Sequence, residues 1–186
     1  IYIEGKDYCS MKPEELRKPI AMVPQQVNLF SGTIRENLLL ADPNANDEKL
    51  KEALSEAGLG SFLKTLPKGL DSDVGNAGAA LSGGQRQKMG IARALLSEAQ
   101  YMIFDEATSS VDPQSEREIW ETIGRLSKTR TLIIISHRMS TIQNANCIYV
   151  LEKGVVAQRG SHAELMQQGG LYRELVTRQQ AMEVAE

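Results

Sequence analysis

Three short apolar runs in the chain each end directly in polar residues. They are Ile20–Val23, Tyr101–Phe104 and Thr131–Ile135. Each run predicts a short buried strand, and the second is too short for a helix and suits a strand buried on both faces of a parallel sheet. The sequence therefore predicts an α/β fold. Because ligands of parallel sheets bind outside the carboxyl ends of the strands, the residues after these runs are the first candidates for a site.

The residues that follow these runs can carry chemistry. Asp105 and Glu106 follow the second run, and two adjacent acids repel each other unless a cation or hydrogen bonds compensate. The alternative for this pair is a role in helix capping. His137 follows the third run, although a lone histidine is more often structural than catalytic. Gln25 follows the first run after Pro24, where a glutamine is more often a loop residue than a ligand.

A helix is predicted to begin at Ser82. Ser82 precedes Gln85 by three residues, which is the spacing of a capping box. Gly83 and Gly84 leave the backbone N–H groups of the first turn bare, and free N–H groups at the positive end of a helix attract phosphate oxygens. The alternative is an ordinary capped surface helix. By their spacing, Met89, Ala92 and Leu96 are expected to face a core, and Arg86, Lys88 and Arg93 to point elsewhere.

Further helices are predicted on both sides of this segment. Thr33–Leu40 and Asp47–Ala57 have helical patterns, with Asp47 as a plausible cap for the second. Another helix is expected after Asp112, because aspartate is a good N-cap and Pro113 suits the first helical position. Glycines are expected to break the stretch before Ser82 into loops, namely Gly58, Gly60, Gly69, Gly75 and Gly78.

The last part of the chain predicts a hairpin and two helices. Ile148–Leu151 and Val155–Ala157 are the expected strands, with a turn near Gly154. The helices follow near His162–Gln168 and Leu171–Gln180, and the histidine that begins the first of them is interpreted as a surface residue.

Length, charge and cysteine content narrow the class of protein. The chain has 186 residues and a formal net charge of -3, so one domain is expected and a basic nucleic-acid-binding surface is not. Cys9 and Cys147 lie far apart, and two cysteines in such a chain fit a reduced cytosolic protein better than an oxidised secreted one. No apolar run approaches the ~18 residues of a membrane span. We therefore expect a chain that is soluble as given and has no nucleic-acid partner.

Several segments together resemble the ATP-binding cassette proteins. The signature sequence of that family is similar to LSGGQRQ followed by a basic helix that ends in ARALL, and its Q-loop region is similar to VPQQVNLFSGTIRENL. The acidic pair resembles a Walker B motif, the turn that ends at Asp112 resembles a D-loop, and SHR resembles the segment of the switch histidine. Residues 140–176 are similar to the end of exporter cassettes. The resemblance covers essentially all 186 residues and implies a P-loop NTPase-like, mainly parallel sheet with an inserted helical subdomain.

The resemblance assigns roles to the candidate residues. It implies that Asp105 holds Mg²⁺, usually through water, and that Gln25 is a metal-sensing residue. It implies that Glu106 polarises the water that attacks ATP and that His137 contacts the γ-phosphate. The D-loop of Asp112 would touch the opposite cassette of a dimer. The signature residues would close on the nucleotide of that cassette, namely Ser82, Gly83, Gly84 and Gln85.

The same resemblance implies a reaction and partners. The reaction is phosphoryl transfer from ATP to water, with ATP and Mg²⁺ as cofactors. The partners are a second nucleotide-binding domain, in a homodimer or a heterodimer, and the transmembrane domain of an exporter, at the cytoplasmic face of a membrane. Exporter cassettes usually carry Glu-Arg-Gly before the signature for a polar contact to the transmembrane partner. This chain has Val74–Gly78 there, with Asn76 and Ala77 in place of the two charges.

One expected motif does not occur in the chain. It contains no G-x-x-x-x-G-K-[ST] loop, whose N–H groups and lysine hold phosphates. The chain starts with Ile1, and Ile1–Gly5 predicts a strand running into a turn. We therefore expect a fragment that begins after the phosphate loop and does not hydrolyse ATP alone. The expected core lobe comprises residues 1–25 and 100–186, and the expected helical signature subdomain comprises residues 26–99.

Two other functions share parts of this pattern. One is a non-hydrolysing, cassette-like interaction module, which the missing phosphate loop favours and the intact Glu106 and His137 disfavour. The other is the ATPase head of a chromosome-maintenance protein, which needs a long coiled coil between its phosphate loop and its signature. The 80 residues before Leu81 contain no heptads, which disfavours that head. The transported substrate cannot be read from this chain.

Overall fold

The structure is a computed structural model that describes residues 2–3, 5–109 and 111–183. The chain divides into two compact units, Ile1–Ile135 and Ser136–Glu186. Within the described ranges, every helix is too short or too polar to cross a membrane.

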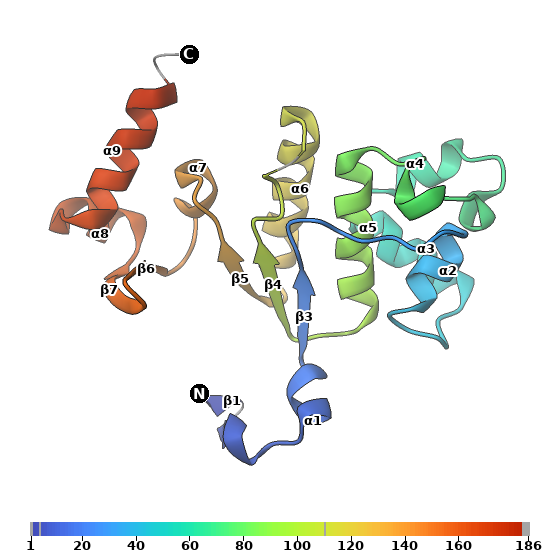
Figure 1. The fold of residues 1–186 in the computed structure, drawn as a ribbon, viewed down its shortest axis with the longest axis horizontal. Helices are drawn as coiled ribbons and strands as arrows, with labels where there is room; N and C mark the ends of the chain where they lie inside the picture. Colours follow the sequence, from blue (N-terminus) through green and yellow to red (C-terminus); the bar gives the residue numbers. More distant parts are fainter. Residues whose placement is uncertain (1, 4, 110, 184–186) are drawn as a thin grey trace. The chain divides into compact units, whose positions relative to one another are not determined.

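The first unit contains a parallel three-stranded sheet with β4 in the middle (Figure 1). Its strands coincide with the three apolar runs: β3 (Ile20–Val23), β4 (Tyr101–Asp105) and β5 (Thr131–Ile135). Val23 lies opposite Phe104, and Phe104 lies opposite Ile134, so the three strands end at the same edge. The predicted α/β fold with a parallel sheet is confirmed.

The two faces of this sheet are covered unequally. Met102 of β4 is fully buried and shares a hydrophobic core with Ile119 of helix α6 (Pro113–Leu126). On the opposite face, Met22 of β3 and Ile133 of β5 are 54% and 49% exposed. The burial predicted for β3 and β5 is therefore found on one face of each strand only. In the part of the chain that the structure describes, the helical core covers the other face of these strands.

Two very short strands and a helical turn precede β3. These elements are β1 (Tyr2–Ile3), β2 (Lys6–Asp7), the 3₁₀ turn η1 (Tyr8–Ser10) and α1 (Pro13–Arg17). β1 and β2 pair antiparallel across Gly5, whose φ of 80° is a conformation that glycine adopts readily. The predicted strand and turn are found at Tyr2–Ile3 and Gly5, whereas Ile1 and Glu4 lie outside the described residues.

The segment between β3 and β4 is mostly helical (Figure 1). Its elements are α2 (Ile34–Leu39), α3 (Asp47–Glu56), α4 (Gly60–Thr65), η2 (Gly69–Asp71), η3 (Asn76–Gly78) and α5 (Gly83–Leu96). The helices expected at α2, α3 and α5 are confirmed, whereas the loop expected at α4 is wrong. A side chain on Gly60 would lie 3.3 Å from the Ser55 backbone. A glycine at this position therefore allows α4 to approach α3 closely. The expected boundaries of a helical subdomain at residues 26–99 stay a prediction.

Helix α3 begins with a different cap from the predicted one. The Asn46 side chain accepts a hydrogen bond of 2.9 Å from the Lys49 N–H and caps the helix. Asp47 is the first helical residue, and its carboxylate pairs with Arg35 of α2. The prediction of Asp47 as the cap is wrong because its neighbour already fills that position.

Helix α5 buries its predicted apolar side and also one of its basic residues. Met89, Ala92 and Leu96 are buried, as predicted. Lys88 was expected to point elsewhere, but it is buried and forms an ion pair with Glu118 of α6. The prediction for Lys88 is wrong because α6 packs along that side of the helix and supplies a carboxylate.

The second unit contains a hairpin and three helices in its described part. The elements are α7 (Met139–Ile142), β6 (Ile148–Glu152), β7 (Val155–Gly160), α8 (His162–Gln168) and α9 (Leu171–Glu183). β6 and β7 pair antiparallel, and the turn at Lys153 and Gly154 has positive φ values of 50° and 83°. The predicted hairpin and both predicted helices are confirmed.

His162 lies against the small core of the second unit. Its Nδ1 lies 2.8 Å from the hydroxyl oxygen of Tyr172, and the two rings meet edge to face. Tyr172 is fully buried with Leu165 and Val176, and this burial raises the pKa of its hydroxyl. His162 is the first residue of α8, as interpreted, and its side chain is partly exposed.

Candidate functional site

Gln25 and the acidic pair lie at one edge of the sheet, after the neighbouring strands β3 and β4. Gln25 follows β3 by two residues, and Asp105 is the last residue of β4. The Gln25 side-chain amide donates a hydrogen bond of 2.9 Å to the hydroxyl of Ser109, three residues after Glu106. The structure thus brings Gln25 together with the segment that carries the acids. Ser109 had no predicted role, and its position after the acids was the only signal for it.

The backbone at Glu106 is held in an uncommon conformation. Its φ is 47°, a region that costs a non-glycine residue about 1–3 kcal/mol unless the surroundings enforce it. The Glu106 N–H donates to the carbonyl of Ile135 at 2.9 Å, and its own carbonyl accepts from the Ser109 N–H at 3.0 Å. Bonds to β5 and to the following turn therefore fix this residue on both sides. Such strain is typical of functional sites.

Helix α5, the signature helix, begins with the reciprocal cap that its sequence predicts. The Ser82 hydroxyl accepts from the Gln85 N–H at 3.2 Å, and the Gln85 side-chain oxygen accepts from the Ser82 N–H at 2.9 Å. Ser82 is nevertheless exposed. Its hydroxyl therefore lies at the surface at the N-terminus of the 14-residue helix α5, where the helix dipole is positive.

Gly84 lies against the start of helix α6. A side chain on Gly84 would clash with Cβ and Oγ of Ser115, so α5 and α6 approach more closely there than any larger residue allows. The Ser115 N–H donates at 2.9 Å to Asp112, which caps α6 as predicted. Hydrogen bonds from Ser115 hold the pKa of Asp112 below its usual range. Ser115 therefore joins the first turn of α5, which contains Gly84, to the turn that ends at Asp112. The sequence pattern does not reveal this contact.

Helix α5 also binds the loop that follows β3. The buried Gln87 side chain donates to the carbonyl of Pro24 at 2.9 Å. Arg93 donates to the carbonyl of Asn28 at 2.7 Å and to the carbonyl of Asn37 at 2.8 Å. Burial lowers the pKa of Arg93.

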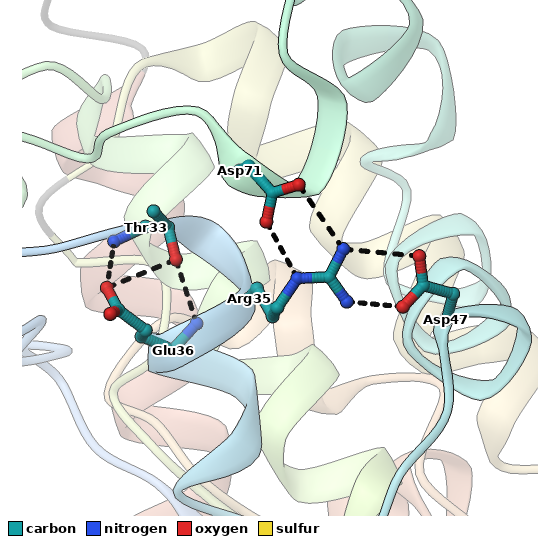
Figure 2. Close-up of polar contacts among 5 residues, drawn as sticks. All are labelled: Thr33, Arg35, Glu36, Asp47 and Asp71. Atoms are coloured by element: carbon teal, nitrogen blue, oxygen red, sulfur yellow. Dashed lines mark hydrogen bonds and ion pairs between the residues drawn. The ribbon is translucent and has the colours of Figure 1, made fainter.

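A network around Arg35 ties together three elements of the helical segment (Figure 2). Arg35 of α2 pairs with Asp47 at the start of α3 and donates from Nε to Asp71 of η2 at 2.7 Å. These two carboxylates raise the pKa of Arg35, and Arg35 lowers the pKa of both. The adjacent Thr33 and Glu36 form a second capping box, which starts α2. Helix α2, which follows the loop of Gln25, is therefore fixed by its cap and by the ion pairs of Arg35.

His137 belongs to the second compact unit. It lies two residues after the end of β5 and is exposed. The next residue, Arg138, donates from its N–H to the hydroxyl of Ser136 at 3.0 Å. The other candidate residues all belong to the first unit.

The donor atoms at the edge of the sheet suit a hard cation. Asp105 offers a carboxylate and Gln25 an amide oxygen, and Mg²⁺ is usually bound by one or two such ligands together with water and phosphate oxygens. Among the described residues, no three histidine, cysteine or acidic side chains gather into a protein cage for a metal. The oxygen donors of these residues therefore fit a Mg²⁺ that keeps further ligands from outside the protein.

Comparison with known proteins places the chain in a family. The sequence profile described as ABC transporter matches residues 1–109, which is more than half of the chain. The chain belongs to the ABC transporter family. The resemblance seen in the sequence motifs is thereby confirmed, and the parallel sheet agrees with the fold expected from it.

Relatives of the chain are considerably longer than it is. P-glycoprotein 14 of Caenorhabditis elegans is 44% identical over 177 residues, which cover 95% of this chain and 13% of that protein. An ATP-dependent lipid A-core flippase of Desulfotalea psychrophila is 44% identical over 179 residues, covering 96% of this chain and 31% of that protein. A solved bacterial Atm1-family ABC exporter with ATP bound matches 96% of this chain and 31% of its own, with a TM-score of 0.88 and 37% identity. The chain therefore spans less than a third of these proteins.

Proposed function

We propose that this chain is part of an ATP-hydrolysing domain that drives export by an ABC transporter. The observation that carries the proposal is the hydrogen bond from Gln25 to Ser109, which joins the end of β3 to the acidic segment after β4. Two relatives support a role for the nucleotide, since one is named ATP-dependent and the other is an exporter with ATP bound. These relatives favour transport over the chromosome-maintenance alternative.

The proposed reaction is transfer of the terminal phosphoryl group of ATP to water. A bound Mg²⁺ would neutralise charge that develops on the phosphate oxygens. Asp105 and Gln25 would hold that ion, in agreement with their oxygen donors. Glu106 would polarise the attacking water as general base, and the fixed backbone at this residue supports a precise position for its carboxylate. His137 would hold the γ-phosphate.

We propose further that the domain works as a dimer with a second nucleotide-binding domain. Ser82, Gly83, Gly84 and Gln85 would then close on the nucleotide of the opposite subunit. The exposed hydroxyl of Ser82 at a positive helix end supports this role. Asp112 would lie at the same interface, since its turn packs beside the signature turn through Ser115.

The proposed second partner is the transmembrane domain of the transporter, at the cytoplasmic face of a membrane. Phe30 supports this partner because it is 64% exposed in the loop after Gln25, which the resemblance assigns to that contact. The charged pair expected near the signature is replaced by Asn76 and Ala77, and Asn76 accepts a hydrogen bond of 3.2 Å from the Ser31 hydroxyl. We propose that docking relies on the loop of Phe30 rather than on charges at 76–77.

The proposal is tested by ATP binding and turnover in the complete protein that carries this chain. Glu106→Gln should keep nucleotide binding and lower turnover by about 10²–10⁴-fold, which is the usual contribution of a general base. Glu121→Gln is the matched control, because Glu121 is exposed on α6, and it should leave turnover unchanged. Binding without turnover in the unmodified protein would instead support a non-hydrolysing interaction module. Normal turnover in Glu106→Gln would contradict the role of Glu106.

A further inference from the structure

One side of helix α5 runs along the loop Pro24–Asn28. Gln87, Gly90 and Arg93 follow one another at intervals of three and so share a side of the helix. Gln87 donates to the Pro24 carbonyl at 2.9 Å, and Arg93 donates to the Asn28 carbonyl at 2.7 Å. Between them, a side chain on Gly90 would come within 2.5 Å of a Val27 methyl group. The signature helix therefore holds this loop at both ends and touches it in the middle.

The bond from Gln87 acts on the peptide unit that begins Gln25. The Pro24 carbonyl and the Gln25 N–H belong to one planar unit, so a fixed carbonyl also fixes the direction in which the chain enters Gln25. Gln87 itself is only 3% exposed. Burying an amide costs free energy unless it is hydrogen-bonded, and the bond to Pro24 compensates this cost. The buried amide and the Pro24 carbonyl therefore hold each other in place.

A continuous series of bonds leads from Gln87 to the acidic segment. Beyond the Pro24 carbonyl, the Gln25 side chain donates to the Ser109 hydroxyl at 2.9 Å. The Ser109 N–H in turn donates to the Glu106 carbonyl at 3.0 Å. Gln25 is exposed, so burial does not hold its side chain in place. Its position depends on the backbone on one side and on Ser109 on the other.

We propose that Gln87 is a positioning residue for Gln25. Through the Pro24 carbonyl it sets where the Gln25 amide lies beside the end of β4, and it links that position to the helix that begins at Ser82. This inference rests on the proposed function, in which Gln25 serves the Mg²⁺ of the nucleotide. Gln87 would not touch the nucleotide, so its effect on turnover should pass entirely through Gln25.

The first experiment measures the position of Gln25 without any activity. In ¹⁵N-labelled chain of 186 residues, relaxation of the Gln25 side-chain amide should show increased motion in Gln87→Met, which keeps the size of the side chain and removes its donor. Gln158→Met is the matched control, because Gln158 also donates from its amide to a backbone carbonyl, that of Gly169, in the second unit. An unchanged Gln25 signal in Gln87→Met would overturn the inference. If Gln87→Met does not fold, Gln87→Asn, which is one methylene too short to reach Pro24, takes its place.

The second experiment is a double-mutant cycle on ATP turnover in the complete protein. Gln87→Met should lower kcat by about 10-fold to 100-fold, the range expected for a small misplacement, with little change in the KM for ATP. In a Gln25→Ala background, Gln87→Met should cause no further loss, since residues that act through one another are not additive. Losses that multiply would overturn the inference.

The two experiments separate this inference from the proposed function. If Gln25→Ala has normal turnover, the metal role of Gln25 fails, whatever the Gln25 signal shows. If Gln25→Ala impairs turnover and Gln87→Met does not, the proposed function stands and the positioning role is overturned.

Discussion

Lys88 of α5 and Glu118 of α6 form an ion pair with a buried cation and a half-exposed carboxylate. The side chains are 8% and 46% exposed, respectively. Lys88 lowers the pKa of Glu118, and the lysine stem lies beside Gly58, whose added side chain would be 3.7 Å away. This pair joins the signature helix to the helix that Asp112 caps, close to the contact between Gly84 and Ser115.

Because the two side chains differ in exposure, replacing Lys88 and replacing Glu118 should have unequal effects on stability. Glu118→Gln leaves a buried ammonium without its carboxylate, which should cost about 1–3 kcal/mol of unfolding free energy. Lys88→Met leaves a carboxylate that water can reach and keeps an apolar stem in the core, so it should cost less. Urea unfolding of the chain at neutral pH measures both values. A larger loss for Lys88→Met would contradict this account, because that variant keeps an apolar stem and leaves only an exposed carboxylate without its partner.

The network around Arg35 predicts acid-sensitive stability. Arg35 lowers the pKa of Asp47 and of Asp71, so the stabilisation from these carboxylates is complete above their unfolded pKa of about 4. It is lost as the pH falls through their lower folded pKa values. Arg35→Met should therefore reduce stability at pH 7, and the difference from the unmodified chain should shrink below about pH 4.

Unfolding free energies of the two chains between pH 7 and pH 3 test this dependence. Lys64→Met, which removes an exposed cation from α4, is the control and should show no pH-dependent difference. Because both carboxylates are largely exposed, salt should weaken the Arg35 effect. A difference that stays constant with pH would assign the Arg35 effect to packing.

Local chemistry explains which parts of this structure could be predicted from the sequence. A short apolar run such as 101–104 and a cap such as Ser82 with Gln85 are determined by neighbours along the chain, and both are found as predicted. The family resemblance likewise depended on short motifs. The prediction of Asp47 as the cap of α3 failed because the adjacent Asn46, which is the actual cap, has nearly the same capping preference.

Contacts between distant segments could not be predicted in this way. Gln87 and Pro24 are 63 residues apart, and Arg35 and Asp71 are 36 residues apart. Helical periodicity shows on which side of a helix a residue lies, but it does not show which element packs against that side. The prediction for Lys88 failed for that reason, because its side of α5 is buried only through the packing of α6 against it. The roles proposed for Glu106 and His137 rest on the resemblance and stay predictions.

Ser82 has two proposed roles, which differ in the size of their effect and in the site where they act. As the N-cap of α5, Ser82→Ala should lower the stability of the chain by about 1 kcal/mol. Ser161→Ala is the matched control, because Ser161 caps α8 with the same reciprocal capping box, and it should cost a similar amount. As a nucleotide ligand, Ser82 would in addition affect turnover at the site of the opposite subunit.

A mixed dimer of the complete protein separates these roles. One arrangement carries Ser82→Ala on one subunit and Glu106→Gln on the other, and the second carries both changes on one subunit. If the signature acts on the opposite subunit, the separated changes damage the same composite site and leave the other site whole. Both changes on one subunit then damage one site each. The separated dimer should therefore be the more active of the two.

The ranking of the two dimers decides where Ser82 acts. A dimer with Glu106→Gln on one subunit alone provides the reference, because it measures the turnover of a single intact site. The separated dimer should match that reference, whereas the dimer with both changes on one subunit should fall well below it. A signature that acts within its own subunit requires the opposite order. Equal activities, both at the level of the reference, would leave Ser82 with its capping role alone, because the loss of a cap is the same in either arrangement.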